Sequence, residues 1–196
     1  MYLRGRFLWR LPAGTRAVAL TFDDGPHPEY TPAVLRLLSD LDVKATFFVI
    51  GRNVTRFPEL VRRIADEGHV LGGHTFDHRE IVTLTPGDLE RELETCRGAI
   101  QDAAKVDTRW FRPPRGRMSL PSVRRVAALG YRTVHWTRTY SDYQCDGTEA
   151  LTRRMTEQAA RPRDIVLLHD HNPHTVAALA TAIPRWRSQG LGFQCI

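Results

Sequence analysis

The sequence predicts an α/β protein with a parallel sheet whose outer side is covered by helices. Short segments that are apolar along their whole length recur through the chain, and segments with helical spacing lie between several of them. Strands of this composition, alternating with helices, are typical of parallel sheets buried on both faces. A closed barrel and an open, doubly wound sheet both fit this alternation, and composition does not choose between them.

Seven segments have the character of buried strands. Each is short, apolar and rich in β-branched or aromatic residues. In chain order they are residues 17–22 (AVALTF), 44–50 (KATFFVI), 69–73 (HVLGG), 109–112 (RWFR), 131–136 (YRTVHW), 164–169 (DIVLLH) and 192–196 (GFQCI).

Three intervening segments have helical periodicity and a residue suited to begin a helix. In chain order they are residues 31–41, with Thr31 as the expected N-cap, residues 85–100, with Thr85, and residues 119–130, with Ser119. A proline in the first turn supports the first two of these starts. On the longest segment Leu89, Leu93, Cys96 and Ile100 fall on one face, which packing against a core explains.

The length and composition fit one soluble domain. A chain of 196 residues buries about 70% of the surface that its unfolded form exposes, so residues 1–196 are expected to form a single domain. Hydrophobic residues make up 42% and charged residues 26%, which excludes the disordered and membrane-embedded classes. The net charge of +6 suits an anionic partner, but the arginines are spread among 22 acidic residues. This pattern favours a solvated basic surface and does not indicate nucleic-acid binding.

The cysteines and the N-terminus favour a cytoplasmic protein. Cys96, Cys145 and Cys195 are too scattered for a disulfide framework, although a single bond between Cys145 and Cys195 stays open. Arginines interrupt the first fourteen residues and leave no apolar segment of signal-peptide length, and no run of about 20 apolar residues indicates a transmembrane helix. A secreted chain from which the export signal has been removed would give the same pattern.

The chemically unusual residues follow the predicted strands directly. The carboxyl ends of parallel strands meet at one face, where barrels and α/β sheets build their active sites. We therefore expect these side chains to converge although they lie far apart in the sequence. In chain order they are Asp23 and Asp24 after the first strand, His74 and His78 after the third, RPPRG (112–116) after the fourth and His169 at the end of the sixth.

The segment HTFDH suggests a metal site. It places His74 and His78 four residues apart, and Asp24 is expected beside them. Two imidazoles and one carboxylate, with water at a fourth position, form a catalytic zinc site of a common kind. A dication would also offset the repulsion between the adjacent carboxylates of Asp23 and Asp24, and would leave one of them free to take a proton. A plain polar turn at DDGP is the simpler interpretation and does not conflict with catalysis.

Together, these motifs resemble those of the polysaccharide deacetylases, the family of the NodB-like homology domain. The resemblance covers about residues 17–194, with the motifs in family order. It implies a distorted, TIM-like (β/α) barrel, which agrees with about seven parallel strands. The five motifs are TFDDGP (21–26), HTFDH (74–78), RPPRG (112–116), a weakened WTRTYSDY (136–143) and LLH (167–169).

The resemblance also implies an activity and a cofactor. The activity would be metal-dependent removal of N-acetyl groups from an N-acetylated sugar or glycan, with release of acetate. By similarity, Asp24, His74 and His78 would hold the divalent metal, most often Zn²⁺, with Co²⁺ as an alternative.

Roles in catalysis follow from the same resemblance. Asp23 would be the general base, held in place by Arg112, and His169 would be the general acid that protonates the leaving amine. The backbone N–H of Arg115 would stabilise the oxyanion. Leu167 would lie beside the acetyl methyl group, and Tyr143 would form an aromatic wall. Trp136, from its place at a strand end, would either line the acetyl pocket or pack in the core.

Two departures from the family pattern affect these roles. Arg115 replaces the aromatic residue that usually follows RPP, and with Arg117 it would make the groove cationic and favour an anionic substrate. Thr139 stands where we expect the aspartate that tunes the acid histidine. A threonine stabilises the imidazolium less than a carboxylate does, so this interpretation predicts a lower pKa for His169 and an acid-shifted activity optimum, unless Asp142 substitutes from nearby.

Other hypotheses stay open at this point. An O-acetyl carbohydrate esterase would use the same metal, base and oxyanion site and would tolerate a weakened acid. A catalytically silent glycan-binding homologue would keep the fold without turnover. The joint presence of the three metal ligands, Asp23, Arg112 and His169 argues against it. His27, His171 and His174 are interpreted as loop or capping residues, not as ligands.

Overall fold

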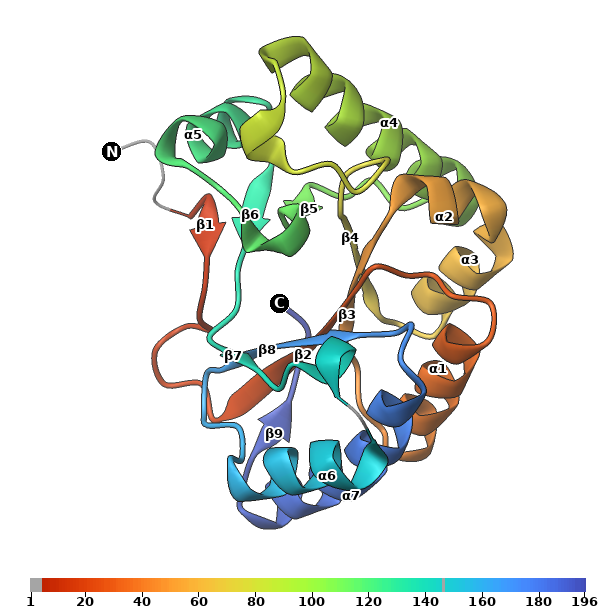
Figure 1. The fold of residues 1–196 in the computed structure, drawn as a ribbon, viewed down its shortest axis with the longest axis vertical. Helices are drawn as coiled ribbons and strands as arrows, with labels where there is room; N and C mark the ends of the chain where they lie inside the picture. Colours follow the sequence, from red (N-terminus) through yellow and green to blue (C-terminus); the bar gives the residue numbers. More distant parts are fainter. Residues whose placement is uncertain (1–4, 146) are drawn as a thin grey trace.

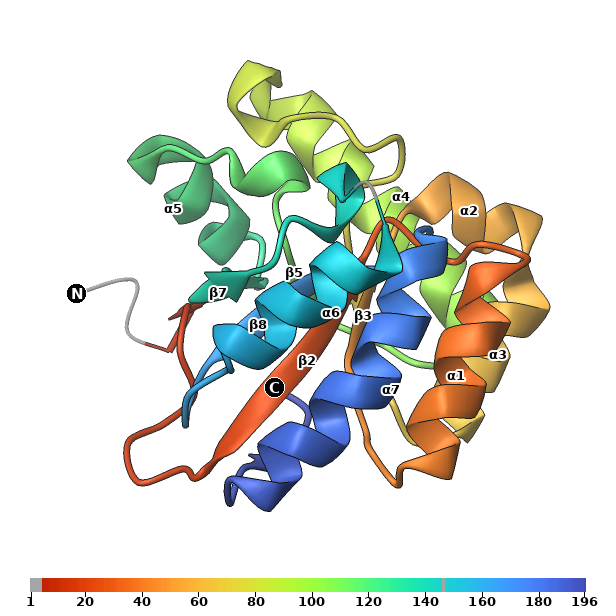
Figure 2. The same cartoon turned by 60° about the horizontal axis from the view of Figure 1, so that its bottom comes forward.

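The computed structural model describes residues 5–145 and 147–196. The first part of the basic N-terminal segment, residues 1–4, and residue 146 lie outside the described residues. Nine parallel strands of the described chain form one curled sheet, and the helices lie on its outer side (Figures 1 and 2). The predicted (β/α) barrel is confirmed as a half-barrel whose two edges, strands β1 and β7, do not pair with each other within the described residues.

The strands number nine where the sequence predicted about seven. Along the sheet their order is β1-β6-β5-β4-β3-β2-β8-β7, and β9 pairs with the first residues of β2. Their bounds are β1 Phe7–Leu8, β2 Ala17–Asp23, β3 Thr46–Val49, β4 Val70–Gly73, β5 Trp110–Phe111, β6 Arg132–Val134, β7 Arg138–Thr139, β8 Ile165–His169 and β9 Gly192–Phe193. The two additional strands, β1 and β7, are two residues long and form the sheet edges.

Seven α-helices and three short 3₁₀ helices connect the strands of the described chain. The 3₁₀ helices are η1 Ile81–Thr83, η2 Pro114–Gly116 and η3 Asp142–Gln144. The α-helices are α1 Tyr30–Asp40, α2 Gly51–Arg56, α3 Pro58–Asp66, α4 Pro86–Ala104, α5 Leu120–Ala128, α6 Thr148–Glu157 and α7 Pro173–Ser188.

The expected helix starts are confirmed in two of three cases. The side chains of Thr85 and Ser119 each accept a backbone hydrogen bond at the N-cap of α4 and α5. The expectation for Thr31 is wrong, because the N-cap of α1 is Glu29, two residues earlier. The Thr31 hydroxyl instead accepts from the backbone N–H of His27 at 2.7 Å and donates to Asp170 at 2.5 Å. Thr31 thus ties α1 to the segment that follows β8.

Strand alternation sorts side chains to two sides of the sheet. In β2 the residues Val18, Leu20 and Phe22 pack outward in the core beneath the helices, whereas Ala19 joins a smaller core inside the half-barrel. Continuing this alternation places Asp23 on the inside. The same parity turns Val166 and Leu168 of β8 outward, so Leu167 and His169 face inward. The apolar residues of these strands therefore anchor the sheet while their alternate neighbours form the site.

Three further observations bear on the sequence predictions. Cys96, Cys145 and Cys195 are free thiols in the structure, so the Cys145–Cys195 bond that stayed open is not formed. Burial raises the pKa of the Cys96 thiol to about 12, which makes it an inert core residue. Across the described ranges, no helix combines the length and apolarity needed to cross a membrane.

Candidate active site

The predicted site residues converge at the carboxyl ends of the strands, around a cavity of about 530 Å³. All of them except Arg112 line this cavity, and Arg112 lies directly behind Asp23. The lining residues are Asp23, Asp24, His74, His78, Arg115, Gly116, Arg117, Trp136, Tyr143, Leu167, His169 and His171. The expected convergence of residues that follow or end β2, β4, β5 and β8 is therefore confirmed.

Asp23 and Asp24 have different surroundings although they are neighbours. Asp23 ends β2 and is 4% exposed, and its Oδ1 accepts a hydrogen bond from Arg112 at 2.7 Å. The chain then turns through a positive φ of 74° at Asp24. Asp24 Oδ1 consequently lies 3.5 Å from His74 Nε2 and 3.2 Å from His78 Nε2. One carboxylate faces a guanidinium and the other faces two imidazoles.

Arg112 is fully buried and fixes the Asp23 carboxylate. One guanidinium nitrogen donates both to Asp23 Oδ1 and to Thr21 Oγ1, each at 2.7 Å. The guanidinium lies over the Phe48 ring, 4.2 Å from its centroid. Because removal of either partner would leave an unpaired buried charge, this ion pair holds the Asp23 carboxylate in one orientation. The Asp23 carboxylate is therefore oriented by Arg112 at the edge of the cavity.

Asp24, His74 and His78 form a candidate metal centre. Their ligand atoms lie within 4.8 Å of one another. Asp24 Oδ1 is buried and has no hydrogen-bond partner among the described residues, as expected for an oxygen that faces a cation. Burial alone would raise the pKa of Asp24, but contact with His78 and the nearby His74 and His169 hold it below its usual range.

The protonation state of His74 also suits a metal. Its Nδ1 pairs with the Arg112 carbonyl oxygen at 2.7 Å, so Nδ1 donates and the Nε2 lone pair points toward Asp24. Burial lowers the pKa of His74, against the opposing effect of Asp23 and Asp24, and thereby favours the neutral imidazole that binds metals. Donor set, tautomer and unpartnered oxygen all fit a divalent cation.

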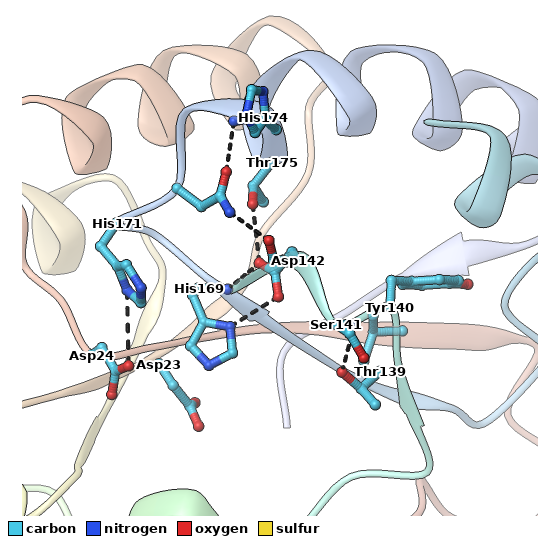
Figure 3. A network of polar contacts seen from close by, with 12 residues as sticks. Asp23, Asp24, Thr139, Tyr140, Ser141, Asp142, His169, His171, His174 and Thr175 are labelled. Atoms are coloured by element: carbon cyan, nitrogen blue, oxygen red, sulfur yellow. Dashed lines mark hydrogen bonds and ion pairs between the residues drawn. The ribbon is translucent and has the colours of Figure 1, made fainter. Parts of the chain in front are cut away.

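His169 lines the same cavity and is held by Asp142 (Figure 3). Its Nδ1 donates to Asp142 Oδ1 at 2.9 Å, and its backbone N–H donates to Asp142 Oδ2 at 2.7 Å. The Thr175 hydroxyl donates to the same Oδ2 at 3.0 Å. Burial lowers the pKa of His169, but the hydrogen bond and charge of Asp142, with Asp23 and Asp24, raise it overall to about 9. His169 is thus a cation near neutral pH.

This geometry corrects the prediction made from Thr139. Thr139 is exposed, and its hydroxyl accepts from the backbone N–H of Ser141 at 3.2 Å, not from His169. The predicted low pKa of His169 is wrong because Asp142, which is fully buried, supplies the tuning carboxylate. The substitution by Asp142 that the sequence left open is the arrangement the protein adopts.

The walls of the cavity come from η2, β8 and the segment after β6. Arg115 has a left-handed backbone (φ 57°), and its side chain pairs with Glu80 at 3.0 Å. Arg117 pairs with the other oxygen of Glu80 at 3.3 Å, which partly offsets the cationic rim expected from the sequence. Trp136 packs on Gly116, where an added Cβ would lie 2.3 Å from the indole. Leu167 lines the cavity from β8, and the Tyr143 ring contacts the His169 ring edge-on.

Comparison with known proteins agrees with this site. A family model described as polysaccharide deacetylase matches residues 10–134. The chain is 36% identical over 200 residues to a peptidoglycan-N-acetylglucosamine deacetylase of Bacillus cereus, covering 96% of this chain and 90% of the relative. The chain belongs to the polysaccharide deacetylase family. The resemblance predicted from the motifs is therefore confirmed.

Two further relatives place the chain within the deacetylase family. It is 37% identical over 193 residues to a chitooligosaccharide deacetylase of Bradyrhizobium, covering 91% of this chain and 88% of that protein. The crystal structure of the Bc1960 peptidoglycan N-acetylglucosamine deacetylase superposes with a TM-score of 0.92 at 28% identity, covering 98% of this chain and 92% of that one. The fold prediction is thus confirmed along nearly the whole chain.

Sequence reasoning missed two residues of the deacetylase site. His171, interpreted as a loop or capping residue, lines the cavity, with its Nδ1 3.8 Å from Asp24 Oδ2 (Figure 3). Its position two residues after His169 was the available signal. Glu92 is buried on α4 and accepts hydrogen bonds from the loop that carries His74 and His78. A glutamate among the apolar positions of a helix face was the signal there.

Proposed function

We propose that this protein removes N-acetyl groups from a glycan by metal-dependent hydrolysis and releases acetate. The observation that carries the proposal is the meeting, in one cavity, of an Arg112-held carboxylate, an Asp-His-His cluster and an Asp142-held histidine. Amide hydrolysis needs a base for water, charge stabilisation for the oxyanion and an acid for the leaving nitrogen. Asp23 would supply the base and His169 the acid, and a divalent cation held by the Asp-His-His cluster would stabilise the oxyanion.

Zinc is the metal we propose for the Asp24, His74 and His78 centre. Two neutral imidazoles and one carboxylate are a common ligand set of catalytic zinc. When bound, the ion would polarise the acetyl carbonyl and make water acidic enough for a carboxylate base.

The protein's own residues would then carry the proton and charge movements. Asp23 accepts the proton of the attacking water while Arg112 keeps the carboxylate oriented. The backbone N–H of Arg115 donates toward the carbonyl oxygen as negative charge develops there. His169 gives its Nε2 proton to the nitrogen as the C–N bond breaks, because an amide anion is too poor a leaving group to depart unprotonated. Leu167 and Trp136 exclude water beside the acetyl methyl group.

The raised pKa of His169 favours N-deacetylation over the O-acetyl esterase alternative. The esterase hypothesis depended on a weakened general acid at His169. Ester hydrolysis tolerates such an acid, because an alkoxide leaves more readily than an amide anion. With a pKa of about 9, His169 remains protonated near neutral pH and can serve an amine leaving group. Peptidoglycan and chitin fragments, the substrates in the names of the relatives, are the first substrates we propose for this protein.

The test is a panel of acetylated glycans assayed for acetate with zinc or cobalt added. The panel contains chitooligosaccharides, peptidoglycan fragments and acetyl-xylan. We expect acetate from an N-acetylated member with the wild type, and none above background with Asp23→Asn. Asp77→Asn is the matched control, because Asp77 is an exposed carboxylate of the 74–78 loop. Release from acetyl-xylan alone would favour the esterase, and release from no member by the wild type would favour a silent homologue.

A further inference from the structure

The loop that carries both histidines of the candidate metal centre has an uncommon backbone. Residues 74–78 join β4 to the segment before η1, and both Thr75 and His78 have φ near 60°. Residues other than glycine rarely adopt this backbone conformation, and a β-branched residue such as Thr75 adopts it only at a cost in free energy. Such a loop keeps its shape only where contacts from outside hold it.

Helix α2 holds the loop from one side. The backbone N–H of Gly51 donates to the Thr75 carbonyl oxygen, and that of Arg52 donates to the Phe76 carbonyl oxygen, each at 3.0 Å. The approach is so close that a Cβ at Gly51 would lie 2.4 Å from the Phe76 ring and 2.9 Å from its Cα. These bonds fix the carbonyl side of the loop.

Glu92 holds the loop from the other side. This residue lies on the buried face of α4 and is 5% exposed. Its Oε2 accepts from the backbone N–H of Phe76 at 2.8 Å and from that of Asp77 at 2.9 Å. Its Oε1 lies 3.8 Å from the Arg79 guanidinium. A buried carboxylate that accepts two backbone N–H groups makes strong, charge-assisted hydrogen bonds.

The two histidines depend on this loop to different degrees. His74 has an anchor of its own, since its Nδ1 bonds to the Arg112 carbonyl oxygen. The His78 ring has no backbone anchor of this kind among the described residues and faces Asp24 and the His74 ring. The direction of His78 is therefore set by the backbone that Glu92 holds, directly before it in the sequence.

We propose that Glu92 is a positioning residue for the metal centre, which fixes the 74–78 loop so that His78 stays directed at Asp24 Oδ1. The inference rests on the proposed function, because it concerns the same centre. Without the Glu92 carboxylate, the N–H groups of Phe76 and Asp77 lose their acceptor and the loop is free to leave its left-handed conformation. His78 then turns away from Asp24, and the ligand set falls from three protein groups to two.

The experiment measures Co²⁺ binding to the full chain by chelator competition, with the visible spectrum of the bound ion as a report on its geometry. The variants are Glu92→Ala, Glu92→Gln and the control Glu90→Gln, an exposed glutamate of the same helix. Loss of a residue that orients a metal ligand typically weakens metal affinity about 10–100-fold. We expect a loss of this size and an altered spectrum for Glu92→Ala, a smaller loss for Glu92→Gln, and no change for Glu90→Gln.

The melting temperature of each metal-free variant separates this role from a merely structural one. If the Glu92 variants melt earlier but, when folded, bind Co²⁺ as tightly as the wild type and with the same spectrum, the inference is wrong. Should Glu92→Ala fail to fold, Glu92→Gln decides alone, since glutamine keeps the size and one acceptor oxygen. If the wild type itself binds no Co²⁺, the proposed metal centre is wrong, and the inference about Glu92 is wrong as well.

Discussion

His169 and Asp142 form a two-point contact, in which the carboxylate accepts from both the ring Nδ1 and the backbone N–H of the histidine. In the metal-free protein burial lowers the pKa of His169, but the hydrogen bond and charge of Asp142, with Asp23 and Asp24, raise it overall to about 9. A general acid works only while protonated, so activity should fall as pH rises through about 9. Asp142→Asn removes the negative charge beside His169 and lowers the pKa of the imidazole. The alkaline limb of the plot of kcat against pH should therefore shift to lower pH by about 1–2 pH units.

Thr139→Asp is the control for this pH prediction. Thr139 is exposed and does not bond to His169, so a carboxylate there should leave the alkaline limb in place. An alkaline limb that stays near pH 9 in Asp142→Asn, or that moves in Thr139→Asp as far as in Asp142→Asn, would show that another group governs it.

The Asp170 carboxyl group is expected to lower the stability of the metal-free protein at high pH. Burial, with the charge of Asp24, raises the pKa of Asp170 to about 7 against the hydrogen bond from Thr31. When folding raises the pKa of a carboxyl group, the stability of the fold is highest at pH values below the unfolded-state pKa near 4. The free energy of unfolding then falls as pH rises toward the folded-state pKa near 7. Asp170→Asn should therefore stabilise the metal-free protein at pH 8, by roughly 1–4 kcal/mol, and less at pH 5.

Denaturant unfolding at the two pH values measures this effect. Asp40→Asn, an exposed aspartate at the end of α1, is the control and should change neither value. A variant Asp170→Asn that is equally or less stable than the wild type at pH 8 would mean that the Asp170 charge is well solvated or paired.

Arg112 should be needed for folding stability as well as for catalysis. Arg112→Met removes the only described donor to Asp23 and leaves a buried carboxylate without its partner. Breaking a buried pair in this way costs about 3–5 kcal/mol, which urea unfolding at pH 7 would detect. Arg115→Met removes an exposed pair with Glu80 and should cost less than about 1 kcal/mol. Equal losses in the two variants would contradict the role given to Arg112.

The sequence predicted the parts of this structure that depend on local composition. The strand before Asp23 was predicted from its apolar run, and the site from polar residues at strand ends. The edge strands β1 and β7 are two residues long and carry no such pattern, because backbone pairing to β6 and β8 defines them. Thr31 has a side chain suited to an N-cap, yet its hydroxyl donates a hydrogen bond to Asp170, 139 residues away.

Contacts between distant segments also explain the errors within the site. Asp142 reaches His169 only because Ser141 turns through a positive φ of 50° into η3. Position 139 was chosen from motif spacing, which does not describe that turn. Glu92 faces a loop 15 and 16 residues before it in the sequence, and only the packing of α4 brings them together.

We infer that the two adjacent carboxylates have different roles, with Asp24 as a metal ligand and Asp23 as the general base. The most direct test is to measure bound zinc and acetate release in parallel for the wild type, Asp23→Asn and Asp24→Asn. We expect Asp23→Asn to keep its zinc and lose about 10²–10⁴-fold in kcat, and Asp24→Asn to lose zinc and activity together. Two variants that lose zinc equally, or an Asp23→Asn enzyme that keeps wild-type turnover, would contradict the account.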